Sequence, residues 1–256
     1  AKEKIINATL SELTNNPEIV TMDQIRLENL RKERAKVAKL YFRQNAANWN
    51  QLRSLHTNES KVETALIKML PKRKNLDLVD IGTGTGRILE VLSPYVAKGI
   101  GIDQSREMLS IARAHLNQLK ISNLHIRHGD MYRLPISNSF VDLVTLHQVL
   151  HYAEDPISVF HESARILRPG GVMIVVDFEP HDIQELRDLH AHRRLGFKQT
   201  DIKKWGAAAG LTMTKERRLP GTPLTVALWS LRKNIKHQRK SSAKVKKTLP
   251  PLENRA

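Results

Sequence analysis

The sequence contains no cysteine among its 256 residues. Disulfide bonds, thiolate metal sites and cysteine nucleophiles are therefore excluded for this chain, as is any arsenic chemistry that depends on thiols. It also has no apolar run of about 18 residues, the length that a membrane-spanning helix needs. The N-terminal sequence AKEKIINATL lacks the apolar core of a signal peptide. Together these absences predict a cytoplasmic protein without a membrane span.

The positive charge of the chain is unevenly distributed. The formal net charge is +16, and residues 232 to 256 alone carry nine Lys or Arg against one Glu. Because this segment has almost no apolar periodicity, we predict a disordered tail. The tail is open to two interpretations: a weak electrostatic contact with nucleic acid or another anionic surface, and an end that only improves solubility.

A long helix is predicted near the N-terminus. The segment from Thr21 to Ser60 contains neither Gly nor Pro, and Thr21 and Gln24 have the spacing of a capping box. Apolar residues recur along it at Ile25, Leu30, Val37, Tyr41, Trp49 and Leu52. We expect this stripe to pack on the main domain or on a partner subunit, which would give a homodimer through the N-terminal helix. Its part from Leu40 to Leu55 is a candidate lid.

The middle of the chain alternates between strand-like and helical segments. Five apolar runs predict strands at 76–82, 99–104, 124–130, 140–149 and 171–178, separated by helical stretches such as 106–120 and 156–167. This alternation predicts an α/β fold with a parallel sheet covered by helices on both faces. Two more strand candidates, 212–219 and 222–231, lie so close together that they can only pair antiparallel.

A glycine-rich loop follows the first predicted strand. Gly82, Gly84 and Gly86 stand at alternate positions in DIGTGTGR, between a strand and a helix. In a parallel α/β sheet, ligands bind outside the carboxyl ends of the strands, where this loop would lie. The loop is also compatible with tight packing alone. Asp103 favours a ligand, because it ends the second strand about twenty residues on, the position from which a carboxylate reaches a ribose.

These motifs, in this order, resemble those of class I S-adenosylmethionine-dependent methyltransferases of the small-molecule, quinone-biosynthesis-like kind. DIGTGTGR resembles their first motif, and GIDQSREML, HGDMYRLP, FVDLVTLHQVLHYAEDP and ARILRPGGVMIVVDF resemble the motifs that follow. The resemblance covers about Val62 to Leu231. It implies a Rossmann-like, mostly parallel sheet of seven strands with an antiparallel last strand, preceded here by a helical N-terminal extension.

The resemblance also implies a cofactor, S-adenosylmethionine, and a set of residues that bind it. Asp80 would organise the loop at the amino-acid end of the cofactor, Asp103 would bind the ribose, and Asp130 would accept from the adenine amino group. The two methionines of the set offer apolar contact to the adenine, although Met108 is equally explained by core packing. The full set is Asp80, Gly82, Thr83, Gly84, Asp103, Gln104, Met108, Asp130, Met131 and His147.

His147 and His151, at the end of the fourth predicted strand, are candidate catalytic bases, which matter for a phenolic or enol-like acceptor. His147 could equally contact the cofactor through its backbone, and His151 could simply pack. Tyr41 or Trp49 could close the cofactor pocket from the N-terminal helix, or serve packing alone. No metal site is predicted, because His181, His190 and His192 lack accompanying carboxylates at ligand spacing and are expected on a polar helix surface.

Residues 41–66, together with LHAHRRLGF and LTVALW, resemble more narrowly the methyltransferase half of bacterial proteins in which an ArsR-type winged-helix regulator comes first. Since the winged helix is missing here, DNA binding is not implied. We predict three regions: a helical extension and lid (1–60), a methyltransferase domain (61–232) and a basic tail (233–256). The expected function is methyl transfer to a small, aromatic or quinone-like acceptor. The alternatives are an S-adenosylmethionine-sensing regulator fragment and a nucleic-acid methyltransferase, although the latter's Asn/Asp-Pro-Pro-aromatic motif is absent after the fourth strand.

Overall fold

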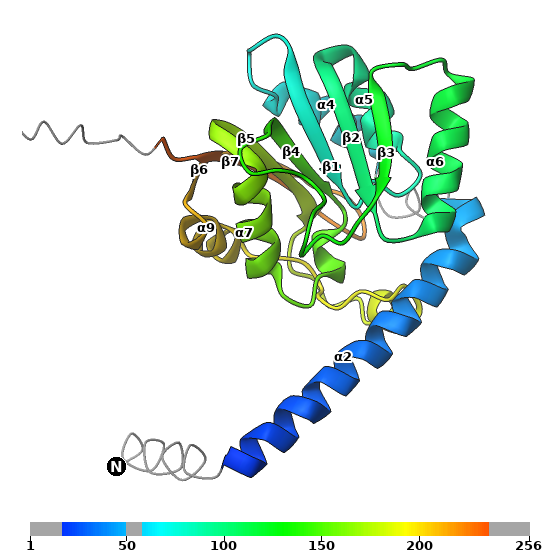
Figure 1. Ribbon diagram of the computed structural model, residues 1–256, viewed down its shortest axis with the longest axis vertical. Coiled ribbons are helices and arrows are strands. Elements are labelled where there is room, and N and C mark those ends of the chain that lie inside the picture. Colours follow the sequence, from blue (N-terminus) through cyan, green and yellow to red (C-terminus); the bar gives the residue numbers. More distant parts are fainter. Residues whose placement is uncertain (1–16, 50–57, 236–256) are drawn as a thin grey trace, which may run out of the picture.

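A computed structural model describes residues 17–49 and 58–235. The described chain folds around one sheet of seven strands in the order β3-β2-β1-β4-β5-β7-β6 (Figure 1). All neighbouring strands pair parallel except at β7, which is antiparallel to both β5 and β6. The strands are β1 (Leu76–Ile81), β2 (Val96–Asp103), β3 (Leu124–His128), β4 (Val141–His147), β5 (Leu167–Phe178), β6 (Leu211–Leu219) and β7 (Val226–Lys233). The predicted α/β fold, with its mostly parallel sheet and antiparallel last strand, is confirmed.

Helices cover both faces of the sheet. The α-helices are α2 (Pro17–Asn45), α4 (Glu59–Met69), α5 (Arg87–Leu92), α6 (Arg106–Gln118), α7 (Pro156–Ile166), α8 (Glu185–Leu189) and α9 (Gln199–Ala208). Short 3-10 helices η1 (Ala46–Asn48), η2 (Ser93–Tyr95) and η3 (Leu150–Tyr152) join them to their neighbours. In Figure 1, α7 and α9 lie over one face of the sheet, and α4 and α5 lie behind the other.

The alternation of side chains along each strand divides the core into two layers. In β1, Leu76 and Leu78 belong to the apolar layer that includes α4 and α5, whereas Val79 and Ile81 belong to the layer that includes α7 and α9. Successive residues of a strand point to opposite faces, so a buried strand needs apolar residues at nearly every position. The same rule explains β5, whose residues from Gly171 to Phe178 are all buried.

The N-terminal helix differs from its prediction. The helix α2 begins at Pro17, so Thr21 and Gln24 lie inside it rather than at its start. The first part of its apolar stripe does not pack on the domain, since Ile25, Leu30 and Val37 are 50%, 56% and 62% exposed, whereas Tyr41 and Trp49 of the same stripe contact it. Only the C-terminal part of α2 contacts the domain, as Figure 1 shows. Leu52 lies outside the described residues.

The C-terminal strand extends further than its predicted limit. Arg232 pairs with Val172 and Lys233 pairs with Leu211, so both residues belong to β7 rather than to the tail. Asn234 continues the connection, since its N–H donates to the carbonyl of Gly210 at 3.1 Å. The predicted disorder of the remaining basic tail concerns residues 236–256, which lie outside the described part of the chain.

A buried carboxylate joins the starts of three neighbouring strands. Asp142 of β4 accepts a hydrogen bond from the backbone N–H of Asp77 in β1 at 3.1 Å and from the Arg168 side chain in β5 at 2.6 Å, and it pairs with Arg73. Burial acts to raise the pKa of Asp142, but these hydrogen bonds outweigh it and hold that pKa below its ordinary value. The ionised form is therefore favoured in the folded state.

We expect Asp142→Asn to lower the free energy of unfolding at pH 7 by about 2 kcal/mol, because charge-assisted hydrogen bonds are lost in a buried place. A carboxyl group with a depressed folded pKa stabilises the protein above its unfolded pKa, and that contribution disappears as the pH falls through the lower folded value. The difference between variant and wild type should thus shrink below about pH 4 in urea titrations. Asp77→Asn is the matched control: Asp77 contacts the same arginine at 2.8 Å but is 30% exposed, and should cost less than about 1 kcal/mol.

Candidate functional site

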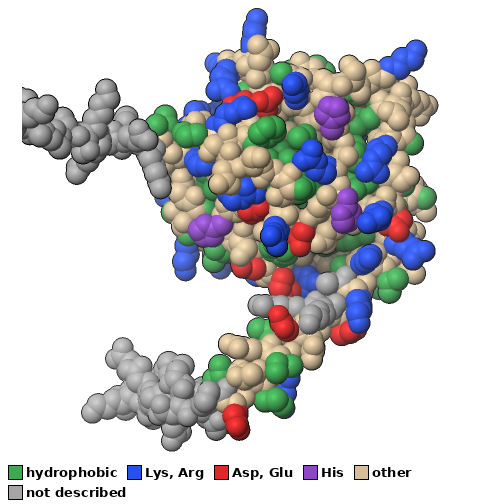
Figure 2. Space-filling view, viewed as in Figure 1, with side chains coloured by type: hydrophobic (Ala, Val, Ile, Leu, Met, Phe, Trp, Pro, Cys, Tyr) green, Lys and Arg blue, Asp and Glu red, His purple; other side chains and the backbone are tan. Residues whose placement is uncertain are grey.

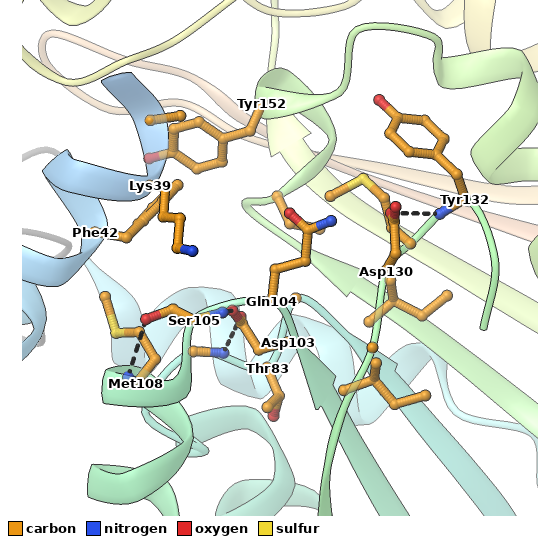
Figure 3. A pocket seen from close by; sticks show the side chains of 18 of the residues that line it. Lys39, Phe42, Thr83, Asp103, Gln104, Ser105, Met108, Asp130, Tyr132 and Tyr152 are labelled. Carbon is orange, nitrogen blue, oxygen red and sulfur yellow. Dashed lines mark hydrogen bonds between the residues drawn. The ribbon is translucent and has the colours of Figure 1, made fainter. Parts of the chain in front are cut away.

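A large cavity among the described residues lies where the strands end. Its volume is about 1190 Å³, and its floor is formed by residues that follow β1, β2, β3 and β4. Residues of α2, among them Lys39 and Phe42, line it on the other side (Figure 3), and Trp49 also lines it. Small-molecule sites typically occupy about 300–1000 Å³, so this cavity has room for more than one ligand.

Almost every site residue predicted from the sequence lines this cavity. All of the predicted cofactor-binding residues line it: Asp80, Gly82, Thr83, Gly84, Asp103, Gln104, Met108, Asp130, Met131 and His147. The exception among all the predicted site residues is His151, which does not line the cavity and is 2% exposed. Parallel strands bring the residues that follow them to one edge, although the sequence separates them by up to 67 positions.

The glycine-rich loop requires its glycines. Gly82 has φ +71° and Gly84 has φ +53°, both in the left-handed region that favours glycine. A Cβ atom on Gly82 would lie 2.2 Å from a methyl group of Val149, and one on Gly84 would lie 3.4 Å from the indole nitrogen of Trp49. The backbone of the loop is thus held between the end of β4 and a tryptophan from the N-terminal region.

Asp103 is fixed against this loop. Its carboxylate accepts hydrogen bonds from the N–H of Gly84 at 2.9 Å and from the N–H of Ser105 at 2.8 Å. Burial raises the pKa of the Asp103 carboxyl, and these backbone donors act in the opposite direction. Backbone N–H groups therefore hold the Asp103 side chain at the end of β2, and their positions do not depend on the rotamers of neighbouring side chains (Figure 3).

The other two acidic residues of the prediction differ in their surroundings. Asp80 is 2% exposed and accepts from the hydroxyl of Thr145 in β4 at 2.6 Å, which joins the ends of two strands. Asp130 lies across the cavity and accepts from the N–H of Tyr132 at 3.0 Å (Figure 3). Met108 is 1% exposed and lines the cavity, so core packing and a ligand contact coexist at this position.

The two candidate histidines separate in the structure. His147 ends β4 and lines the cavity. His151 points into the protein instead: its Nδ1 lies 2.8 Å from Asp177 Oδ1, and its ring stacks on that of His192 with centroids 3.9 Å apart. Because Tyr152 stands next to it and lines the cavity, His151 has no access to a ligand there. The position of His151 therefore agrees with the alternative that this histidine packs in the protein interior.

Aromatic side chains form one wall of the cavity. Phe42 packs edge-on against Trp49 at 5.4 Å and against Tyr152 at 4.9 Å, measured between ring centroids, and all three line the cavity. Tyr41 does not line it, because its hydroxyl lies 2.8 Å from His190 Nδ1. Burial raises the pKa of Tyr152 well above its ordinary value, and the charges of Tyr41 and Asp177 add to this, so its hydroxyl stays protonated.

Several lining residues were not identified from the sequence. They are chiefly Lys39, Phe42, Ser105, Tyr132, Gln148, Tyr152, Glu154 and Arg193. Tyr132 accepts from the backbone N–H of Glu154 at 2.7 Å, and Arg193 pairs with the Glu154 side chain, so both are positioned by the segment after η3. Within this group, only Tyr132 and Tyr152 had a position in the sequence that could have indicated a role in the site, because each comes shortly after the end of a predicted strand.

The histidines expected on a polar helix surface are found elsewhere. The three histidines His181, His190 and His192 flank α8 without belonging to it. The His192 side chain is 7% exposed and stacks on the rings of His151 and Phe178. Burial lowers the pKa of His181, and the proximity of His151 adds to this. No grouping of His, Asp and Glu suited to a metal ion occurs within residues 17–49 and 58–235. In the same residues, no helix has the length and apolarity needed to cross a membrane.

Comparisons with known proteins agree with this geometry. A family model described as a methyltransferase domain matches residues 79–175. The uncharacterized methyltransferase C1B3.06c of Schizosaccharomyces pombe is 36% identical over 118 residues, which cover 43% of this chain and 42% of that protein. The ubiquinone biosynthesis O-methyltransferase of Hydrogenovibrio crunogenus is 30% identical over 135 residues, covering 48% and 56% respectively. The chain thus spans about half the length of these curated relatives.

A solved structure extends the likeness beyond the family match. The crystal structure of YcgJ from Bacillus subtilis aligns with a TM-score of 0.61 at 20% identity, over 67% of this chain and 97% of that one. At this identity the alignment shows a shared fold. Residues 79–175 therefore match a methyltransferase domain, and the described chain shares the fold of YcgJ.

Proposed function

We propose that this chain transfers a methyl group from S-adenosylmethionine to a small, planar aromatic acceptor with a hydroxyl or an activated carbon, as in a quinol. The observation that carries the proposal is the aromatic wall of Phe42, Trp49 and Tyr152, which lines the same cavity as the glycine-rich loop and adjoins that loop where Trp49 lies against Gly84. Flat apolar acceptors pack favourably against such rings.

The residues of the cavity fit the cofactor. A carboxylate at the end of β2 suits the two ribose hydroxyls, and Asp103 is already oriented by the Gly84 and Ser105 N–H groups. The open backbone of the glycine-rich loop suits the amino-acid end, and Met108 and Met131 offer apolar contact to a purine. Asp130 has a second carboxylate oxygen that can accept from an exocyclic amino group.

When bound, S-adenosylmethionine supplies a methyl group on a positively charged sulfur, which any well-placed nucleophile can attack. The chain then has to align the acceptor and keep water out. We assign the first task to the aromatic wall and the second to α2, whose Lys39 and Phe42 line the cavity (Figure 3). For a hydroxyl acceptor, His147 takes the proton that the oxygen loses as its bond to the methyl group forms.

We expect His147→Ala to lower kcat by about 100-fold on a hydroxyl acceptor, the scale of general base catalysis. Its dissociation constant for S-adenosylhomocysteine should stay within about threefold of wild type, because the base acts on the acceptor. His161→Ala is the control, since His161 is exposed on α7 away from the cavity. An unchanged kcat together with weakened cofactor binding would reassign His147 to the cofactor.

The function itself is tested by transfer of a radiolabelled methyl group from S-adenosylmethionine into a whole-cell extract, which is then fractionated into RNA, DNA, protein and organic-soluble material. Label in the organic-soluble fraction supports a small aromatic acceptor. Label confined to RNA or DNA would overturn the proposal in favour of a nucleic-acid methyltransferase. In that case the basic C-terminal segment would attract the nucleic acid electrostatically. Calorimetric binding of S-adenosylhomocysteine without transfer to any fraction would instead indicate the cofactor-sensing alternative, which the resemblance to ArsR-type regulator fusions motivates.

A further inference from the structure

The projecting part of α2 exposes an unusual amount of apolar surface. Between Pro17 and Leu40, seven large apolar side chains are more than a third exposed: Val20, Met22, Ile25, Leu27, Leu30, Val37 and Leu40. Figure 2 shows hydrophobic side chains among charged ones on this helix, away from the body of the domain. A helix this long that buries none of these side chains within the described residues is a typical interaction surface.

Part of this surface has the spacing of a helix–helix seam. Counting alternately three and four residues from Val20 selects six positions, which we call the α2 seam: Val20, Asp23, Leu27, Leu30, Arg34 and Val37. Four of the six are apolar, and the other two carry opposite charges. This spacing keeps all six on one side of the helix along its length. Met22 and Ile25 lie off this seam.

The α2 seam is complementary to itself when reversed. If a second copy of α2 runs antiparallel about the midpoint between Glu28 and Asn29, Val20 meets the partner's Val37 and Leu27 meets the partner's Leu30. In the same register Asp23 meets the partner's Arg34, so the two charged positions neutralise each other twice. Beside the seam, Arg26 comes within one turn of the partner's Glu33. A parallel pair would instead place Asp23 against Asp23 and Arg34 against Arg34.

We propose that α2 pairs with α2 of a second copy of this chain, antiparallel and in this register. Such a pair is isologous, because each seam position meets the same partner position in both directions. Of the α2 residues that line the cavity, Asn29, Lys36 and Lys39 lie on the side of the helix away from the seam, so the pairing leaves that side of the cavity accessible. The two domains lie at opposite ends of the pair, because each contacts only the C-terminal part of its own α2.

Charge reversal tests both the pairing and its direction. We expect sedimentation equilibrium of the full chain to show a dimer, and D23R and R34D each to raise its dissociation constant at least about tenfold, because each places like charges opposite each other at two places. The double variant D23R/R34D should dimerise like wild type. A mixture of the D23R and R34D chains should form a heterodimer, since each of its two charged contacts then joins opposite charges.

M22E is the matched control: Met22 is 52% exposed on the same helix but lies off the seam, so its change should leave the dimer intact. L27E/L30E should dissociate the dimer while circular dichroism keeps its helical signal. A monomer at all concentrations would overturn the proposal, as it would mean that the seam is covered within one chain. A dimer unaffected by D23R and R34D, or one that M22E disrupts, would overturn the register.

Discussion

Replacing Gly196 by alanine should destabilise the domain more than any other single methyl addition that we predict, by about 4 kcal/mol. Gly196 has φ +83°, and a Cβ atom there would lie 2.0 Å from the carbonyl oxygen of Glu179. That oxygen belongs to the backbone, so it cannot turn away like a flexible side chain. The chain around Gly196 pairs closely with the end of β5, since Phe197 N–H donates to the Phe178 carbonyl at 2.9 Å and His181 N–H donates to the Leu195 carbonyl at 3.1 Å.

Gly210→Ala is the matched control for this experiment. Gly210 also has a left-handed φ, +73°, but no atom lies within 4 Å of where its Cβ would be. Gly210→Ala should therefore lower the free energy of unfolding only by the conformational strain of a non-glycine residue at this φ, about 1 kcal/mol. In thermal melts, we expect Gly196→Ala to lower Tm by about 10 °C and Gly210→Ala by about 3 °C. If both variants lowered Tm equally, the prediction would be wrong, because the contact between the new Cβ atom and the Glu179 carbonyl would then cost no stability.

Gly196→Ala should also affect the site, because the segment that Gly196 anchors carries Arg193. Arg193 lines the cavity and pairs with Glu154, and its N–H donates to the carbonyl of His151 at 3.0 Å. A displaced segment would remove this arginine from the cavity mouth without touching the glycine-rich loop. Weakened acceptor binding with unchanged affinity for S-adenosylhomocysteine is the expected signature.

Local patterns predicted the sheet well because they are properties of single segments. Each apolar run between β1 and β5 became a strand, and the short connection around Pro220 left β6 and β7 no choice but antiparallel pairing. The site followed from the same logic, since the end of a parallel strand fixes where its next residue lies. Asp80 lies one residue before the end of β1, Asp103 and His147 end their strands, Asp130 follows β3, and all four line the cavity.

The residues that were missed or misplaced depend on contacts between distant segments. Tyr41 and Phe42 are neighbours in α2, and only the rotation of that helix against the domain sends Phe42 to the cavity and Tyr41 to His190. Nothing within the helix fixes that rotation. His151 resembles His147 in sequence, yet its burial depends on Asp177 in β5, whose carboxylate accepts from both its ring and its backbone N–H.

The insert between β5 and α9 shows the same dependence. Residues 179–198 have little periodicity, so their histidines were expected on a polar surface. In the structure, His192 stacks on His151 and His190 contacts Tyr41, which ties the insert to both η3 and α2. Aromatic and imidazole rings in an irregular segment therefore carry packing information that no pattern of spacing reveals.

Replacing Asp103 by alanine should weaken binding of S-adenosylhomocysteine by about 1000-fold, the largest effect on cofactor affinity that we predict. The two ribose hydroxyls would each donate a hydrogen bond to the Asp103 carboxylate, and together these contribute about 3–6 kcal/mol. The N–H groups of Gly84 and Ser105 fix that carboxylate beside the glycine-rich loop. Titration calorimetry measures the loss, with Asp188→Ala on α8 as a control that removes an exposed carboxylate outside the cavity.

Since Asp103 also organises the loop, the ribose contact has to be separated from a general loss of loop structure. A 2′-deoxy analogue of S-adenosylhomocysteine provides this separation, because it lacks one hydroxyl that the carboxylate would bind. Wild-type protein should bind the analogue at least about tenfold more weakly than the parent compound, whereas Asp103→Ala should bind both alike. If the variant discriminates between the two compounds as strongly as wild type does, the ribose is held by another residue, and Asp103 acts only by holding Gly84 and Ser105 in place.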